Sequence, residues 1–242
     1  MIYAFNGKTL DNHVNKMLEY WDKIKYRYLH TITRVLKAYG IELGYKDADE
    51  FMEILIKLHD VGKASKLYQD YIDGKRKLNG FRHELVSAYY TYHILKKLKN
   101  NEKLAFVGAL TVMLHHEPII MGQIRNLKKR ELSAEVVLDR LGSFDGMVDE
   151  LKDWLKQKVG ISIENVTNND GSNKESKKER DEIIRFVFEM SVKSRHMPNS
   201  EKLRLIIGAL LLPLVMCDYY GAKDREGEAP KFAKILEVER YV

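Results

Sequence analysis

Apolar residues recur every three or four positions along most of the chain, which is the spacing of one face of an α-helix. The longest of these stripes predicts a first helix near the N-terminus and comprises Val14, Met17, Leu18, Trp21, Ile24 and Tyr28. Shorter stripes predict further helices over residues 51–58, 85–95, 147–155 and 183–187. No segment shows the convincing alternation of apolar and polar residues that marks a half-buried strand. The pattern therefore predicts an all-α fold.

Two further segments are apolar on nearly every side, which is typical of helices at the centre of a fold. They span residues 104–114 and 203–216. His115 and His116 directly follow the first segment, and Asp218 follows the second. With 15 glycines and 4 prolines in 242 residues, helix breakers are few. We therefore expect a compact multi-helix bundle whose most buried helices end in polar side chains.

Residues 167–182 interrupt this pattern, because they include no apolar side chain. A segment of this composition cannot bury a core, so we expect a mobile surface loop there. We do not take it as a domain boundary, because Asp218 lies beyond it and belongs to the same candidate site as residues before it. Residues 1–242 are therefore expected to form a single domain.

Composition and charge narrow the class of protein. Lys and Arg outnumber Asp and Glu by 41 to 35, a formal net charge of +6, which suits a polyanionic partner but does not establish one. The one cysteine excludes an intramolecular disulfide framework and a multi-cysteine zinc site. The longest strongly apolar run, residues 205–217, is too short for a membrane span, and the N-terminus lacks the pattern of a signal peptide. We expect a cytoplasmic protein with no membrane association.

The dipeptide His59-Asp60 is the first candidate for chemistry, and it stands in the string LHDVGK at the end of a predicted helix. Neighbouring residues on a helix point about 100° apart, so both side chains can reach one ion. Imidazole nitrogen and carboxylate oxygen together suit divalent transition metals. Asp60 has two carboxylate oxygens and can therefore bridge two ions. Alone, the dipeptide is a weak signal, since a hydrogen-bonded histidine at a helix end has the same pattern.

Other potential ligands stand at helix ends or beside apolar faces elsewhere in the chain. They are His13, His83, His115, His116 and Asp218. Together with His59 and Asp60 they make more groups than the three or four protein ligands that one ion takes. If they converge, the natural count is two metals, which can activate a water and stabilise the attacking and leaving oxygens of a phosphoryl centre.

The order of these residues resembles that of a known family. A histidine, a His-Asp pair, another histidine, a His-His pair and a distant aspartate are similar to the HD superfamily of metal-dependent phosphohydrolases. More narrowly, the chain resembles the HD nuclease of CRISPR type I interference, in the form encoded apart from its helicase. The matching strings are LDNHV, LHDVGK, FRHELVSA, LHHEP and MCDYYGAKDR. The resemblance covers nearly the whole chain and implies an HD-domain bundle with a metal site at its centre.

The resemblance also implies which residues hold each metal. One ion would be held by His13, His59, Asp60 and Asp218. The second would be held or completed by His83, His115 and His116. Asp60 would bridge the two ions.

Three charged residues beside these positions have more than one interpretation. By resemblance, Lys63 would lie near the scissile phosphate and offset charge on its non-bridging oxygens. A lysine there can instead pair with a carboxylate or cap the helix. Glu84 and Glu117 adjoin ligand positions, where they either orient the imidazoles or serve as ordinary surface carboxylates.

The function that the family implies is a metal-dependent nuclease acting on single-stranded DNA, with endonuclease and exonuclease activity and with single-stranded RNA as a second candidate substrate. A metal-activated water would attack the phosphodiester. A separately encoded superfamily 2 helicase, recruited by the RNA-guided surveillance complex, would deliver the strand. The chain contains no P-loop string, which agrees with a separate motor. The candidate ions are Mn²⁺, Co²⁺, Ni²⁺, Fe²⁺ and Mg²⁺, although imidazole-rich ligation argues against a purely Mg²⁺ site.

Two other functions fit the same residues less well. An HD phosphohydrolase acting on nucleotides or cyclic nucleotides would use the first part of the ligand set equally. A metal-stabilised helical adaptor for the helicase would bind metal without turnover, but it would have no need of Lys63. Substrate tests separate these alternatives from a nuclease.

Overall fold

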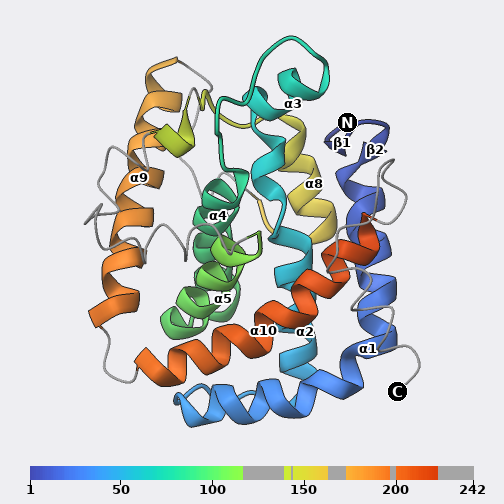
Figure 1. The fold of residues 1–242 in the computed structure, drawn as a ribbon, viewed down its shortest axis with the longest axis vertical. Coiled ribbons are helices and arrows are strands. Elements are labelled where there is room, and N and C mark those ends of the chain that lie inside the picture. Colours follow the sequence, from blue (N-terminus) through green and yellow to red (C-terminus); the bar gives the residue numbers. More distant parts are fainter. Residues whose placement is uncertain (117–138, 143, 163–172, 197–199, 223–242) are drawn as a thin grey trace.

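The structure, a computed structural model, describes residues 1–116, 139–142, 144–162, 173–196 and 200–222. In these ranges it is mostly helical, which confirms the predicted all-α class (Figure 1). The elements in chain order are β1 (Tyr3–Phe5), β2 (Lys8–Thr9), α1 (Leu10–Ala38), α2 (Tyr45–Leu58), the 3-10 helix η1 (Val61–Ala64), α3 (Lys66–Ile72), α4 (His83–Lys99), α5 (Glu102–Leu114), α8 (Glu150–Lys158), α9 (Asn173–His196) and α10 (Ser200–Gly221).

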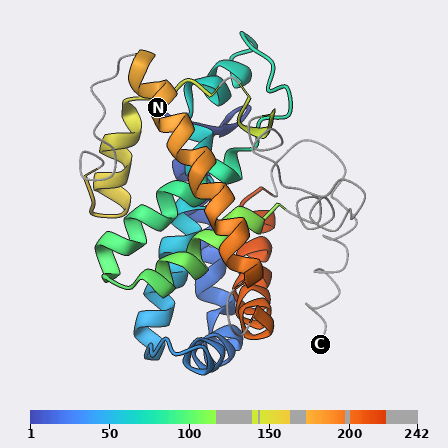
Figure 2. The same ribbon diagram turned by 90° about the vertical axis from the view of Figure 1, so that its left-hand side faces the viewer.

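Helices from distant parts of the chain pack side by side (Figures 1 and 2). Helix α1 lies along α10, α4 lies along α5, and α2 contacts all four of these helices. The turn η1, which follows α2 closely, packs against α4. The C-terminal end of α2 is therefore enclosed by elements that the sequence separates widely, and this places the His59-Asp60 dipeptide at the centre of the bundle.

Side-chain caps mark where several of these helices begin. The hydroxyl of Thr9 accepts a hydrogen bond from the Asn12 amide at the start of α1. Asn101 does the same for Leu104 at the start of α5, and the hydroxyl of Ser65 caps α3. Each cap satisfies one of the amides that the first turn of a helix leaves without a partner.

A polar contact fastens α1 to α2. The indole nitrogen of Trp21, which is fully buried, donates to Oδ1 of Asp49 at 2.7 Å. Nζ of Lys25 lies 2.9 Å from the other oxygen of Asp49. Both oxygens of one α2 carboxylate are thus paired with α1, which fixes how the two helices lie against each other.

The hairpin formed by β1 and β2 was not expected from the hydrophobic pattern. Its register pairs Tyr3 with Thr9 and Phe5 with Lys8, and Gly7 in the turn has φ of +74°. Strands of three and two residues are too short to show a period, so only the Asn-Gly dipeptide in the turn signals a hairpin. The hairpin contacts the beginning of α1.

Helix α9 differs from the mobile loop expected over residues 167–182. It begins at Asn173 and so occupies the later part of that segment, whereas residues 167–172 lie outside the described ranges. Lys, Glu and Arg favour helices, so a lack of apolar residues does not prevent one. Glu179 is only 4% exposed and accepts a 2.5 Å hydrogen bond from the hydroxyl of Tyr90 on α4. A polar contact thus secures this part of α9.

Helix α10 is apolar and long enough, by length and composition alone, to cross a membrane between Glu201 and Gly221. It packs against α1, α2 and α5. Its fully or largely buried side chains include Leu203, Ile206, Leu210 and Leu214. Core helices of folded proteins pass the same test, so the composition of α10 is weak evidence for a membrane span.

Candidate metal centre

His59 and Asp60 follow the last residue of α2, and neither side chain is exposed. The chain then turns into η1, where Gly62 lies directly against the start of α4. A Cβ at this position would stand 2.1 Å from the carbonyl oxygen of His83, and the Gly62 amide donates to the hydroxyl of Ser87 at 2.8 Å. The glycine of the LHDVGK string therefore permits a close contact that brings His83 to Asp60.

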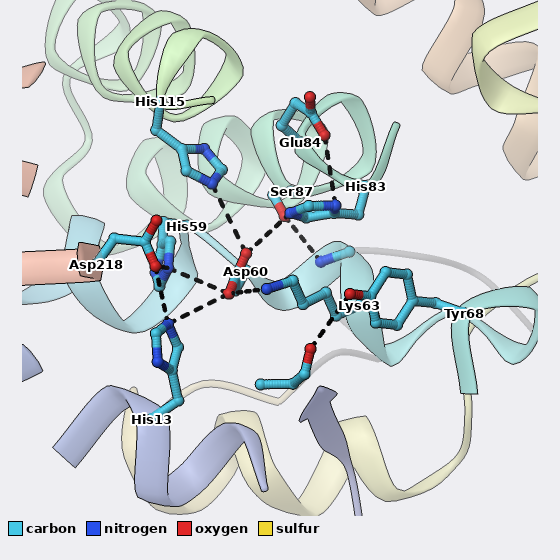
Figure 3. A network of polar contacts seen from close by, with 12 residues as sticks. His13, His59, Asp60, Lys63, Tyr68, His83, Glu84, Ser87, His115 and Asp218 are labelled. Carbon is cyan, nitrogen blue, oxygen red and sulfur yellow. Dashed lines mark hydrogen bonds and ion pairs between the residues drawn. The ribbon is translucent and has the colours of Figure 1, made fainter. Parts of the chain in front are cut away.

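The first group of potential ligands joins α1, the end of α2 and the last turns of α10 (Figure 3). Nε2 of His13 lies 3.1 Å from Oδ1 of Asp218 and 3.4 Å from Oδ2 of Asp60. Nε2 of His59 lies 3.3 Å from the same Asp60 oxygen. One ligand atom from each of the four residues lies within 4.8 Å of the others, so they can hold one ion.

The second group uses the other oxygen of Asp60. Nε2 of His83 lies 2.9 Å from Oδ1 of Asp60, and Nε2 of His115 lies 3.7 Å from it. His116 completes the group, and again the four ligand atoms lie within 4.8 Å of one another. The structure thus brings together all seven side chains that the sequence suggested, with Asp60 common to both groups.

Backbone contacts orient two of the imidazoles. Nδ1 of His59 donates to the carbonyl of Ile56 at 2.8 Å, and Nδ1 of His115 donates to the carbonyl of Val112 at 2.6 Å. A carbonyl only accepts, so in each ring Nδ1 carries a proton and Nε2 is the nitrogen left to bind a metal. Both Nε2 atoms face Asp60. Metal-binding histidines commonly have this second hydrogen bond.

The donor set fits a divalent cation. Nε2 of His13, His59 and His115 is buried and makes no hydrogen bond in the described part of the chain, although carboxylate oxygens lie nearby. Buried polar atoms without a partner are costly, and a cation in each group would satisfy those of that group. Mixed imidazole and carboxylate ligation suits transition metals. The chain therefore provides two adjoining groups of side chains, each of which could hold a divalent ion.

The electrostatics of the first group favour ionised carboxylates. Burial tends to raise the pKa of Asp60, but the charges of His59 and Lys63 outweigh it and hold that pKa well below its usual value. Burial likewise opposes ionisation of Asp218, but its close contacts with the imidazoles of His13 and His59 hold its pKa well below the usual value. Both aspartates are anionic at neutral pH and attract a cation.

The imidazoles of the two groups differ in charge. Burial opposes a charge on His59, but the ionised Asp60 and its contact with Asp218 raise the pKa of His59 to about 10. In the second group, burial together with His115 and His83 lowers the pKa of His116 to about 2. Burial also lowers the pKa of His83. Without metal, the first group holds a proton that a cation must displace, whereas His83 and His116 are neutral.

Lys63 is buried beside Asp60, where its Nζ lies 2.6 Å from Oδ2. The ring of Tyr68 covers it at 5.9 Å from the centroid. The carboxylate pairing considered for this lysine is therefore present. The same position places its positive charge beside the oxygen that the first group shares.

Glu84 is buried next to His83. Its Oε2 lies 3.4 Å from Nδ1 of His83, and its Oε1 lies 3.3 Å from Arg82. These contacts match the expected orienting role rather than that of an exposed carboxylate. Glu117, which was considered for the same role, lies outside the described residues.

Sequence reasoning overlooked three residues that support the site. The hydroxyl of Ser87 accepts a hydrogen bond from the Gly62 amide. Lys8 donates a hydrogen bond to the carbonyl of Gly221, and Gly221 lies against the ring of His13. The Asn-Gly turn signals the hairpin that carries Lys8, and the glycine at the end of an apolar helix signals close packing. No local pattern indicates what these residues touch, because each contact joins distant segments.

Comparison with known proteins supplies independent information. No protein-family model matches the chain. The chain is 64% identical over 242 residues to a CRISPR-associated endonuclease Cas3-HD of Methanocaldococcus jannaschii, covering 100% of this chain and 96% of the relative. It is 49% identical over 240 residues to a protein of the same name from Pyrococcus furiosus, covering 98% and 97%. A solved structure, the CRISPR-associated Cas3 HD domain protein from M. jannaschii, is similar with a TM-score of 0.74 and 57% identity, over 87% of this chain and 97% of that one.

Proposed function

The chain belongs to the Cas3-HD family of CRISPR-associated endonucleases, and on that premise we propose that it hydrolyses phosphodiester bonds of single-stranded DNA at a two-metal site centred on Asp60. Its class is that of a metal-dependent HD nuclease, and it is the stand-alone form of this domain. The substrate, the number of ions and the role of each residue are what we propose. Residues 1–242 act in this proposal as one nuclease domain.

The observation that carries the proposal is the division of the Asp60 carboxylate. One oxygen faces His13 and His59, and the other faces His83 and His115. A carboxylate in this position can bridge two ions. Adjoining ions are the arrangement that stabilises both the attacking and the leaving oxygen in phosphoryl transfer.

Two divalent ions bound here would supply an activated water and positive charge at the scissile phosphate. The chain supplies the metal-binding atoms. The helices hold these atoms in place before an ion or substrate binds, so little reorganisation is needed. Lys63 supplies one more positive charge at the same centre. This supports a role for Lys63 in stabilising negative charge on the phosphate, which we propose for it.

The proposed substrate and partners follow from the family and from charge. A formal net charge of +6 favours a polyanion over a small neutral substrate. We propose that a separately encoded superfamily 2 helicase, recruited by the CRISPR surveillance complex in the cytoplasm, delivers single-stranded DNA. Exonuclease activity and cleavage of single-stranded RNA are part of the proposal. The candidate ions remain Mn²⁺, Co²⁺, Ni²⁺, Fe²⁺ and Mg²⁺.

A cleavage assay on metal-stripped protein tests this function. End-labelled and internally labelled single-stranded DNA, RNA of the same sequence and a panel of mononucleotides are incubated with each ion in turn. Asp60→Asn, which keeps the volume of the side chain, is compared with wild type, and Asp22→Asn serves as a control because Asp22 is exposed. We expect metal-dependent cleavage of the DNA by wild type and Asp22→Asn and none by Asp60→Asn.

The other outcomes are equally informative. Hydrolysis of mononucleotides with intact polymers would identify a nucleotide phosphohydrolase instead. Metal binding without turnover of any substrate, repeated with the helicase present, would identify the adaptor. Cleavage by Asp60→Asn at the wild-type rate would contradict a site centred on Asp60.

A further inference from the structure

The hairpin is hydrogen-bonded directly to the end of the helix that carries Asp218. Nζ of Lys8 on β2 donates to the carbonyl oxygen of Gly221, the last residue of α10, at 2.9 Å. The Lys8 side chain is buried, with 9% of the residue exposed. A buried lysine is uncommon because its charge loses hydration. Its contact with the end of α10 therefore calls for an explanation.

The end of a helix is a favourable place for such a charge. The last four carbonyl groups have no partner within the helix, and together they form its negative end. A lysine amino group donates to one of these oxygens and offsets the negative potential. Lys8 can therefore hold the end of α10 in place from a neighbouring element, which water at an exposed helix end cannot do.

That end of α10 lies directly on a candidate ligand. A Cβ on Gly221 would stand 2.8 Å from Nδ1 of His13 and 2.7 Å from Cγ of Met17, so only glycine permits this approach. One turn earlier in α10, Oδ1 of Asp218 lies 3.1 Å from Nε2 of the same His13 ring. The position of this helix end thus sets the geometry between His13 and Asp218.

The hairpin also touches His13 from another side. The ring of Phe5 on β1 meets the imidazole edge to face, with centroids 6.0 Å apart and planes at 76°. Nζ of Lys8 in turn lies 5.7 Å from the centroid of Phe5. One short hairpin therefore contacts both the α1 ligand and the end of the α10 helix that faces it.

We propose that Lys8 is a positioning residue for the first metal group, which it serves by holding the end of α10 so that Asp218 stays opposite His13. The proposal rests on the proposed function, because it assumes that the first group binds a divalent ion. In this proposal Lys8 acts through the end of α10 and not as a ligand of the ion. Its effect should appear in metal affinity at the first group and not at the second.

Calorimetric titration with Mn²⁺ tests this inference in full-length, metal-stripped protein. His116→Ala serves as the background, because it leaves the first group as the intact one. Adding Lys8→Met replaces the amino group with an uncharged, unbranched side chain of similar length. This change should weaken Mn²⁺ binding by about tenfold to 100-fold, as loss of groups that orient metal ligands generally does. Lys8→Arg, which keeps the donor and the charge, should restore most of the affinity. In an Asp218→Asn background, where the second group is the intact one, Lys8→Met should leave the affinity unchanged.

A matched control separates positioning from general stability. Lys25→Met removes another lysine that links two elements, α1 and α2, away from the end of α10. It should lower the melting temperature without changing Mn²⁺ affinity. Wild-type affinity in the Lys8→Met variant, or equal losses at both groups, would overturn the inference. If Lys8→Met does not fold, Lys8→Gln takes its place with the same two outcomes. Absence of Mn²⁺ binding in the His116→Ala background itself would instead contradict the proposed function.

Discussion

Nζ of Lys63 lies 2.6 Å from Oδ2 of Asp60, the same oxygen that faces His13 and His59 at 3.4 and 3.3 Å. The lysine therefore occupies one side of an oxygen that a cation in the first group would use. In the metal-free protein it offsets the charge of a buried carboxylate. Lys63 and a bound cation act on the same atom.

This relationship predicts two separable effects of Lys63→Met. The variant should lower the free energy of unfolding of the metal-free protein by about 3 kcal/mol, because it leaves a buried carboxylate with one partner fewer. Saturating Mn²⁺ should recover much of that loss. Cleavage of single-stranded DNA should fall about 100-fold or more, as loss of one charge-stabilising donor commonly causes.

Urea unfolding with and without Mn²⁺ and single-turnover cleavage measure these effects. Lys66→Met is the control. Lys66 is exposed and lies after the Asp60 ligand in the sequence, so this variant should change neither the free energy of unfolding nor the cleavage rate. Unchanged cleavage by Lys63→Met would remove this lysine from the proposed catalytic role. It would leave the ion pair with Asp60 as its whole function.

The two ligand groups predict a pattern of metal stoichiometry. Wild type should bind two Mn²⁺ per chain, and Asp218→Asn and His116→Ala should each bind one, because each change affects one group. Asp60→Asn should lose both ions, since Asp60 belongs to both groups. Calorimetry and the electron paramagnetic resonance of free Mn²⁺ measure the number bound. A single ion in wild type would show that the groups do not act as two sites.

The charge state of His59 predicts that metal binding depends on pH. The pKa of this imidazole is raised from 6.5 to about 10, so the metal-free form is protonated at pH 7 and must lose its proton to coordinate. Since metal binds the deprotonated form, affinity at the first group should rise with pH up to that pKa. The rise should be about tenfold per pH unit for each proton released.

Titration of the His116→Ala variant in buffers of different ionisation enthalpy counts these protons. The Asp218→Asn variant, in which the second group is intact, should show a weaker dependence, because the pKa values of His83 and His116 are lowered and these rings are already neutral. Equal proton release in both variants would contradict the assigned charge states.

Gly62 predicts a sharp loss of stability on the smallest substitution. In Gly62→Ala the new methyl group would stand 2.1 Å from the carbonyl oxygen of His83, a backbone atom that cannot move independently. We expect a loss of about 3 kcal/mol, at the upper end for overpacking, together with weaker metal binding at the second group because His83 must shift. Thermal unfolding and Mn²⁺ titration measure both.

Gly208→Ala is the matched control for this prediction. Gly208 lies inside α10 with nothing within 4 Å of the position of a Cβ. Because alanine favours helices more than glycine, this change should stabilise the protein by about 0.5–1 kcal/mol. Destabilisation by both variants would mean that the close approach of Gly62 to α4 is not the cause.

Much of the architecture was predictable because helices are specified locally. The 3.6-residue spacing in α1 and the all-round apolar character of α5 and α10 reflect which sides of each helix are buried. Ligand-type residues such as Asp60, His115 and Asp218 stand at or near helix ends that these patterns delimit. The fold class and the composition of the site were therefore available from the order of the residues.

The hairpin and the first turns of α9 were not predictable in this way. Strands of two and three residues are too short to show a period, and the polar start of α9 is secured at Glu179 by Tyr90 on another helix. In both cases the stabilising contact lies outside the local window. A pattern read along the chain does not include it.

The sequence by itself determined most of the helices, the candidate ligands and the family, because each of these depends on residue types and their spacing. Only the tertiary structure decided which oxygen of Asp60 faces which histidines, that Lys63 pairs with one of them, and that Lys8 holds the helix end at Gly221. These contacts depend on how helices pack across long separations in sequence, up to the 213 residues between Lys8 and Gly221. Packing of that kind is set by the shape and volume of the whole core, which no local pattern contains.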